Sequence, residues 1–120
     1  YYIQYAHARI CSVLRKAEAD FKKLNKSDLE LLDSDREVEI QKMLRQYPDL
    51  IKRAALSSEP HLICYYLRDL ASSFHSYYNS EKFLIDDKNL MRSRLFLLCG
   101  VKQVVHNGLS ILGIDAPEEM

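Results

Sequence analysis

Tyr2, Tyr5 and Arg9 fall at i, i+3 and i+7 at the start of the chain. If this segment is helical, the three side chains lie within about 60° of one another. A separate, neighbouring stripe of the same helix is apolar: Ala6, Ile10, Val13, Ala17 and Phe21. Two aromatic rings and a guanidinium therefore share a surface that the core does not use. Such a surface suits unstacked bases and phosphates, because proteins read single-stranded RNA by stacking bases on aromatic rings.

The charge of the chain does not decide whether this surface binds RNA or a protein. Lys16 and Lys23 continue the seven-residue spacing that starts at Arg9, and they add positive charge for phosphates. The whole chain, however, has 17 basic and 17 acidic residues, and a neutral total is not a sign of nucleic-acid binding. From the residues alone, a tyrosine-rich face for a protein partner fits as well as an RNA face.

Catalytic and metal-binding patterns are weak in this sequence. His7 and Cys11 have the i, i+4 spacing of half a metal site, but no further ligands are recognisable, so we predict no metal. Packing in the core explains this pair better than nucleophilic catalysis does. Cys64 and Cys99 lie far from Cys11 and from each other, which favours reduced thiols over a disulfide framework. The glycines are too dispersed to form a phosphate-binding loop.

The elements that position these residues are helices. With 120 residues, 48% apolar residues and only three glycines and three prolines, the chain predicts one all-α domain over residues 1–120. We expect a bundle of about five helices with short connections. Pro48 and Pro60 each suit the first position of a helix. The expected helices are 2–24, 35–46, 48–57, 60–78 and 88–112, with a short helical turn at 28–32 before the second.

Several residues predict where these helices begin and end. Ser27 with Glu30, and Ser34 with Glu37, have the spacing of a capping box. Asp86 or Asp87 can cap the last helix, and Gly113 can end it. That helix has two apolar faces, so it should be central.

The sequence also predicts the cellular location of the protein and that the chain is part of a longer one. Reduced cysteines and the lack of a signal peptide or long apolar run predict a cytoplasmic protein without a membrane segment. The chain begins within an expected helix and without an initiator methionine, so we expect it to be a fragment of a longer protein.

Both ends of the chain resemble one family. Residues 2–9 (YIQYAHAR) and 11–17 (CSVLRKA) closely resemble the start of the C-terminal anticodon-binding domain of arginyl-tRNA synthetases. Residues 105–120 resemble the extreme C-terminus of that family, including a terminal methionine, and residues 66–71 and 74–78 resemble its penultimate long helix. The resemblance covers essentially the whole chain, and its first and last motifs are the specific ones.

The resemblance implies an all-α domain of the type shared by arginyl- and cysteinyl-tRNA synthetases. Such a domain docks the anticodon loop of arginine tRNA, while a catalytic domain of the same chain attaches arginine with ATP and Mg²⁺. The class I catalytic signatures are missing from these 120 residues. We therefore expect this fragment to be non-catalytic and to bind no cofactor. A helical protein–protein interaction module with no RNA role is the alternative.

The resemblance also implies which residues contact the anticodon loop. The tyrosines and arginine of the first motif match Tyr2, Tyr5 and Arg9. The tyrosine that closes the penultimate helix matches Tyr78, and the terminal methionine matches Met120.

Overall fold

The computed structural model of the chain describes residues 1–17 and 29–120. This part of the chain has four α-helices and no strand: α1 (Tyr2–Ala17), α3 (Asp35–Ser57), α4 (His61–Ser80) and α5 (Lys88–Ile111). The all-α prediction is confirmed, with four helices here instead of about five. The predicted continuation of the first helix over residues 18–24 and the predicted cap at Ser27 lie outside the described residues.

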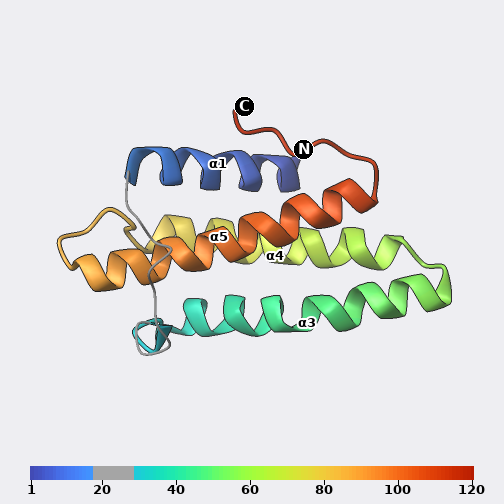
Figure 1. Cartoon of the computed structure of the whole chain (residues 1–120), viewed down its shortest axis with the longest axis horizontal. Helices are drawn as coiled ribbons and strands as arrows, with labels where there is room; N and C mark the ends of the chain where they lie inside the picture. The colour runs from blue at the N-terminus through green and yellow to red at the C-terminus, as the bar shows by residue number, and fades with distance from the viewer. Residues whose placement is uncertain (18–28) are drawn as a thin grey trace.

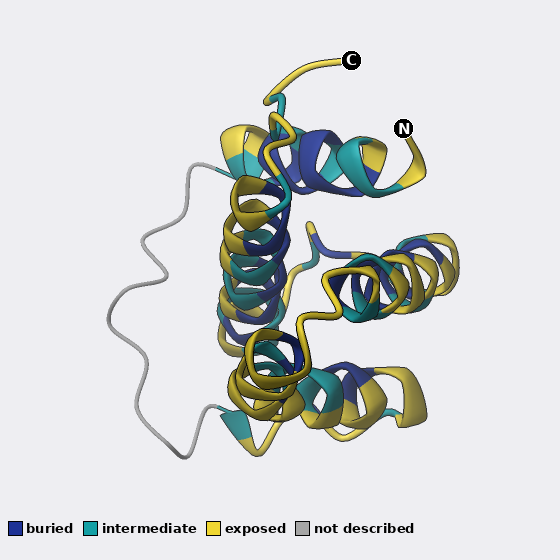
Figure 2. Ribbon diagram, turned by 90° about the vertical axis from the view of Figure 1, so that its right-hand side faces the viewer, coloured by how far each residue is buried: buried dark blue, intermediate teal, exposed yellow. Residues whose placement is uncertain are grey.

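The four helices form a bundle with α4 and α5 in the middle (Figure 1). Each of these two helices packs against all the others, whereas α1 and α3 lie on opposite sides and do not contact each other within the described helices. Viewed along the bundle, the buried positions face inward between the helices (Figure 2). One shared core therefore fixes α1 relative to α4, and these two helices carry most of the predicted site.

α5 is buried on two faces, as its sequence predicts. Leu95, Leu98 and Val105 are fully buried on one face, and Leu97, which lies nearly opposite Leu95 around the helix, is buried on the other. Complete burial of each such side chain stabilises the fold by roughly 1.5–3 kcal/mol. A Cβ atom on Gly108 would lie 2.8 Å from a methyl group of Leu67, so the glycine permits close packing of α5 on α4.

The predicted break between two helices at residues 46–48 is wrong, because Pro48 lies inside α3. An interior proline removes one backbone hydrogen bond and costs about 3 kcal/mol. The helix continues because its buried face continues past the proline, with Ile40 before it and Ala54 after it in the same core. The predicted boundary at Pro60 is confirmed: Ser58 ends α3 with a left-handed φ of 53°, and α4 begins at His61.

The predicted capping box at Ser34 and Glu37 forms at the start of α3. The buried Glu37 carboxylate also accepts hydrogen bonds from the Tyr77 hydroxyl at 2.6 Å and from Arg94 Nε at 2.8 Å. Burial acts to raise the pKa of Glu37, but the hydrogen bonds from Tyr77, Ser34 and Arg94 outweigh it and lower the pKa. This network ties the beginnings of α3 and α5 to the end of α4, where Tyr78 lies.

Two further predictions concern the ends of α5. Asp87 caps its first turn and accepts a hydrogen bond from the Leu90 backbone N–H at 3.2 Å. Gly113 adopts a φ of 74° just beyond the helix, a conformation that favours glycine. The chain then reverses, and residues 114–120 run back over α1 (Figures 1 and 2). Both caps are therefore confirmed, and the second one returns the end of the chain to its beginning.

Candidate nucleic-acid interface

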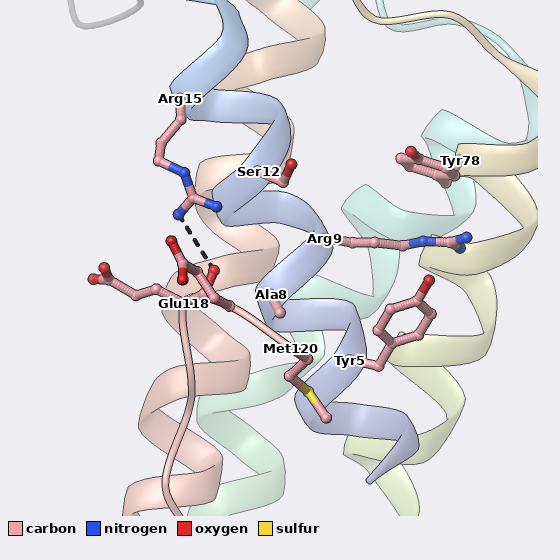
Figure 3. Close-up of a pocket in the computed structure, with 9 residues that line it drawn as sticks. Tyr5, Ala8, Arg9, Ser12, Arg15, Tyr78, Glu118 and Met120 are labelled. Atoms are coloured by element: carbon pink, nitrogen blue, oxygen red, sulfur yellow. Dashed lines mark hydrogen bonds between the residues drawn. The ribbon is translucent and has the colours of Figure 1, made fainter.

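A pocket of about 460 Å³ opens between α1, the end of α4 and the C-terminal tail (Figure 3). Four of the five residues named from the sequence line it: Tyr5, Arg9, Tyr78 and Met120. The remaining lining residues are Ala8, Ser12 and Arg15 from α1 and Glu118 and Glu119 from the tail. Folding thus brings side chains from both ends of the chain and from α4 into one pocket.

The Arg9 guanidinium lies between two tyrosine rings (Figure 3). Its Cζ atom is 4.7 Å from the ring centroid of Tyr5 and 4.2 Å from that of Tyr78. Cation–π contacts of this kind contribute about 0.5–1 kcal/mol each at exposed sites. The helical spacing of Tyr5 and Arg9 predicts their proximity, whereas the contact between Arg9 and Tyr78 depends on how α4 packs against α1.

Tyr2 is the one predicted residue that does not line this pocket. Its ring lies 4.7 Å from the ring of His75 on α4, and the ring of Tyr5 stacks on His75 at 5.5 Å. Tyr2 is 45% exposed, so it presents a ring to solvent beside the pocket. Tyr2, Tyr5 and Arg9 therefore do share one face of α1, and His75 fills the space beneath it.

His75 is the main residue at the site that the sequence analysis did not assign to it. It is only 8% exposed, and its Nδ1 atom lies 3.1 Å from a terminal nitrogen of Arg9. A guanidinium can only donate, so Nδ1 accepts and the ring proton sits on Nε2, which faces the Tyr2 carbonyl at a long 3.5 Å. Its spacing from Tyr78, three residues away on the same helix, was the available signal.

The charge state of His75 agrees with this arrangement. Burial lowers its pKa most, the Tyr2 carbonyl raises it, and the positive charge of Arg9 lowers it again. Because the net shift is downward from the ordinary value of 6.5, the ring is neutral at pH 7. A neutral ring keeps the lone pair on Nδ1 that Arg9 needs.

Side chains of α1 hold the tail that carries Met120. His7 Nδ1 donates to the Pro117 carbonyl at 2.8 Å. Two weaker bonds flank it, from Gln4 to the Asp115 carbonyl at 3.0 Å and from Arg15 to the Glu118 carbonyl at 3.3 Å. The sequence analysis named Met120 but not the residues that hold it in place.

Within residues 1–17 and 29–120, the His7–Cys11 pair has no further side chains grouped with it as metal ligands would be. The Cys11 sulfur is 3.7 Å from His7 Nδ1, but that nitrogen is already bonded to the tail. Burial is the main cause that raises the pKa of Cys11, so the thiol is protonated and a poor nucleophile at pH 7. In the described part of the chain, no three histidine, cysteine or acidic side chains are grouped as metal ligands would be.

A second groove begins at Tyr78 and continues away from the first pocket. It has a volume of about 330 Å³, and Lys16 and Lys82 contribute its positive charges. The predicted basic face of α1 therefore reaches from Arg9 to Lys16, while Lys23 lies outside the described residues. Glu81 also lines this groove, but its carboxylate is paired with Arg94 at 3.3 Å.

Comparison with known proteins defines the class of domain. Residues 3–120 match the family described as the DALR anticodon binding domain, and the chain belongs to this family. None of the described helices has the length and apolar content needed to cross a membrane.

The individual relatives are synthetases for one amino acid. The chain is 50% identical to the arginine–tRNA ligase of Coxiella burnetii over 124 residues, which cover all of this chain and 21% of that protein. The arginyl-tRNA synthetase structures of Thermus thermophilus and Plasmodium falciparum superpose with TM-scores of 0.86 and 0.85, at 34% and 25% identity. Each match covers 99% of this chain and 21% of the solved one, so the chain spans about a fifth of its relatives.

Proposed function

We propose that this chain binds the anticodon loop of an arginine tRNA, as one domain of a full-length arginine–tRNA ligase. The observation that carries the proposal is the pocket in which Tyr5, Arg9, Tyr78 and Met120 meet, in a chain that belongs to an anticodon-binding family. Aromatic rings and a guanidinium are the groups that proteins use to contact unpaired nucleotides, and here they line an open pocket.

Arg9 is the group that reads the RNA in this proposal. A guanidinium has five N–H donors, and His75 is its one hydrogen-bond acceptor among the described residues. The other donors are therefore available to a phosphate or a base edge. Because two rings and one histidine fix the guanidinium in place, the RNA does not have to order it on binding.

The tyrosines have two different roles. The ring of Tyr5 already contacts Arg9 and His75, and the ring of Tyr78 contacts Arg9, so these two buttress the guanidinium and offer their hydroxyl edges. Tyr2 and Met120 are the more exposed members, at 45% and 56%. They contact the unstacked bases, and a base stacked on an aromatic ring gains on the order of 1–3 kcal/mol.

The remaining steps of the reaction belong to the rest of the enzyme. A catalytic domain attaches arginine with ATP and Mg²⁺, in the cytoplasm, and this domain binds neither ATP nor metal. Its contribution is positional, because anticodon binding aligns the distant acceptor end of the tRNA.

The test measures RNA binding by the full-length enzyme. A fluorescently labelled anticodon stem–loop of arginine tRNA is titrated at low salt and followed by anisotropy. We expect Tyr5→Ala and Arg9→Ala each to raise Kd at least about tenfold, or about 1.4 kcal/mol. Tyr65→Ala and Arg45→Ala are matched controls, because both residues are exposed and lie away from the pocket. Wild-type Kd values for both pocket variants would overturn the proposal in favour of a protein-binding face.

A further inference from the structure

We propose that His75 is a positioning residue for RNA binding, which holds the Arg9 guanidinium in the orientation that the anticodon loop requires. The inference rests on the proposed function and adds a residue that does not itself line the pocket. The juxtaposition that carries it is a buried imidazole whose acceptor nitrogen meets the one cation held between Tyr5 and Tyr78.

Three contacts place the His75 ring beneath the binding face of α1. Nδ1 lies 3.1 Å from Arg9, and the ring centroid lies 4.7 Å from that of Tyr2 and 5.5 Å from that of Tyr5. The residue is 8% exposed, so water does not compete freely for the nitrogen atoms of its ring. One side chain of α4 thus touches all three residues of the α1 motif.

The hydrogen bond to Arg9 has a fixed direction. Arginine donates at any physiological pH, so it requires an acceptor, and a neutral histidine supplies one at Nδ1. Cation–π contacts alone leave a guanidinium free to turn in the plane between two rings, whereas a hydrogen bond to one terminal nitrogen fixes that rotation. The remaining donors of Arg9 are then presented in one orientation, which lowers the ordering cost of binding.

Filling of space does not explain a histidine here. The ring of His75 contacts the rings of Tyr2 and Tyr5, and ring contacts of this kind are open to any aromatic side chain. The nitrogen atoms are what distinguish histidine from phenylalanine, and both face α1, one toward Arg9 and one toward the Tyr2 carbonyl. The chemistry of this position is therefore directed at the binding face.

Two substitutions distinguish the effect of the hydrogen-bond acceptor of His75 from the effect of its ring. His75→Phe keeps an aromatic ring but removes both nitrogens, and His75→Asn loses the ring but places an amide oxygen near the position of Nδ1. In the full-length enzyme, we expect His75→Phe to raise Kd for the anticodon stem–loop about fivefold, since it removes the hydrogen bond that orients Arg9. His75→Asn should restore most of that loss. If His75→Phe does not fold, His75→Met serves as the apolar variant.

A double-mutant cycle shows whether His75 acts through Arg9. In the Arg9→Ala background, we expect His75→Phe to cause no further change in Kd. An equal loss in both backgrounds, or no recovery with asparagine, would overturn the inference. The two proposals fail differently. If Arg9→Ala itself leaves Kd unchanged, the proposed function is wrong, whereas a large Arg9→Ala effect with no His75→Phe effect contradicts only the role of His75.

Discussion

Replacing Glu37 by glutamine should destabilise the fold more than any surface substitution, because this carboxylate links three helices. It is 1% exposed and accepts hydrogen bonds from Tyr77 and Arg94 as well as from the backbone of its own capping box. The glutamine amide presents a hydrogen-bond donor where the carboxylate presents an acceptor. One of the partners therefore loses its acceptor, and the charge of Arg94 loses its counter-ion at Glu37.

The magnitude follows from the burial of the pair. The side chain of Arg94 is 12% exposed and that of Glu37 is 1% exposed, so this is a buried ion pair. Removing one partner of such a pair costs about 3–5 kcal/mol. Arg94 keeps a second carboxylate, Glu81, and the carbonyl of Lys82, so we expect the low end of that range, about 3 kcal/mol.

The destabilisation caused by Glu37→Gln should become smaller as the pH falls. The pKa of Glu37 in the folded chain is below the ordinary value of 4.5, because its hydrogen bonds outweigh the opposing effect of burial. A carboxyl group with a lowered pKa adds stability above its unfolded pKa, and that stability is lost as pH falls through the folded pKa. The difference between wild type and Glu37→Gln should therefore be complete at pH 7 and shrink below about pH 4.5.

Urea unfolding followed by circular dichroism, at pH 7 and at steps down to pH 3, measures both the loss of stability and its dependence on pH. Glu39→Gln is the matched control, since Glu39 is an exposed glutamate on the same helix, and it should change stability by no more than about 0.5 kcal/mol. Equal unfolding midpoints for wild type and Glu37→Gln at pH 7 would refute the reasoning. A difference that does not shrink in acid would refute the pH argument alone.

Two further predictions concern helix packing and the tail. Gly108→Ala should lower the free energy of unfolding by about 1–2 kcal/mol, because the new Cβ meets the fully buried Leu67. Gly100→Ala should be neutral or slightly stabilising, because the nearest contact of its new Cβ is a flexible side-chain end at 3.2 Å. Equal urea midpoints for the two variants would contradict this prediction. His7→Leu removes the bond to the Pro117 carbonyl, so hydrogen exchange of the tail amides should accelerate and Kd for the anticodon stem–loop should rise about threefold. Unchanged tail exchange in that variant would show that His7 does not hold the tail.

Local sequence signals predicted the helices well, because those signals act over a few residues. The spacing of Ser34 and Glu37, Asp87 before the last helix and Gly113 after it each identified a real helix end. Pro48 misled the prediction for a physical reason. Its cost of about 3 kcal/mol is local, whereas the burial of α3 on both sides of it is a tertiary effect that no short window contains.

The site was predictable in part. Helical spacing alone grouped Tyr2, Tyr5 and Arg9, and the resemblance to a family added Tyr78 and Met120. The contact of Arg9 with His75 spans 66 positions in sequence, so it depends on how α4 packs on α1. The spacing of His75 from Tyr78 places it near the site, but its contact with Arg9 follows only once both helices are in place.

Polar side chains of α1 bond to the backbone of the tail and help to set its path. Among the described residues, three side chains of α1 bond to backbone carbonyls of the tail: Gln4, His7 and Arg15. The same helix presents Tyr5 and Arg9 to the pocket. One helix therefore sets the position of the guanidinium and of the tail that closes the pocket around it.

Under the proposed function, this arrangement makes the affinity for RNA depend on how firmly α1 is docked. Ala6 and Ile10 are completely buried beneath that helix, on the face next to the binding residues, and they pack it onto the core. Any loosening of α1 displaces Arg9, the tyrosines and the tail together. Binding would then have to dock the helix again, and the affinity would fall by the free energy that this docking costs. By the same linkage, the proposed binding of RNA to this face would stabilise the docked helix, since a ligand that prefers the ordered state shifts the equilibrium toward it.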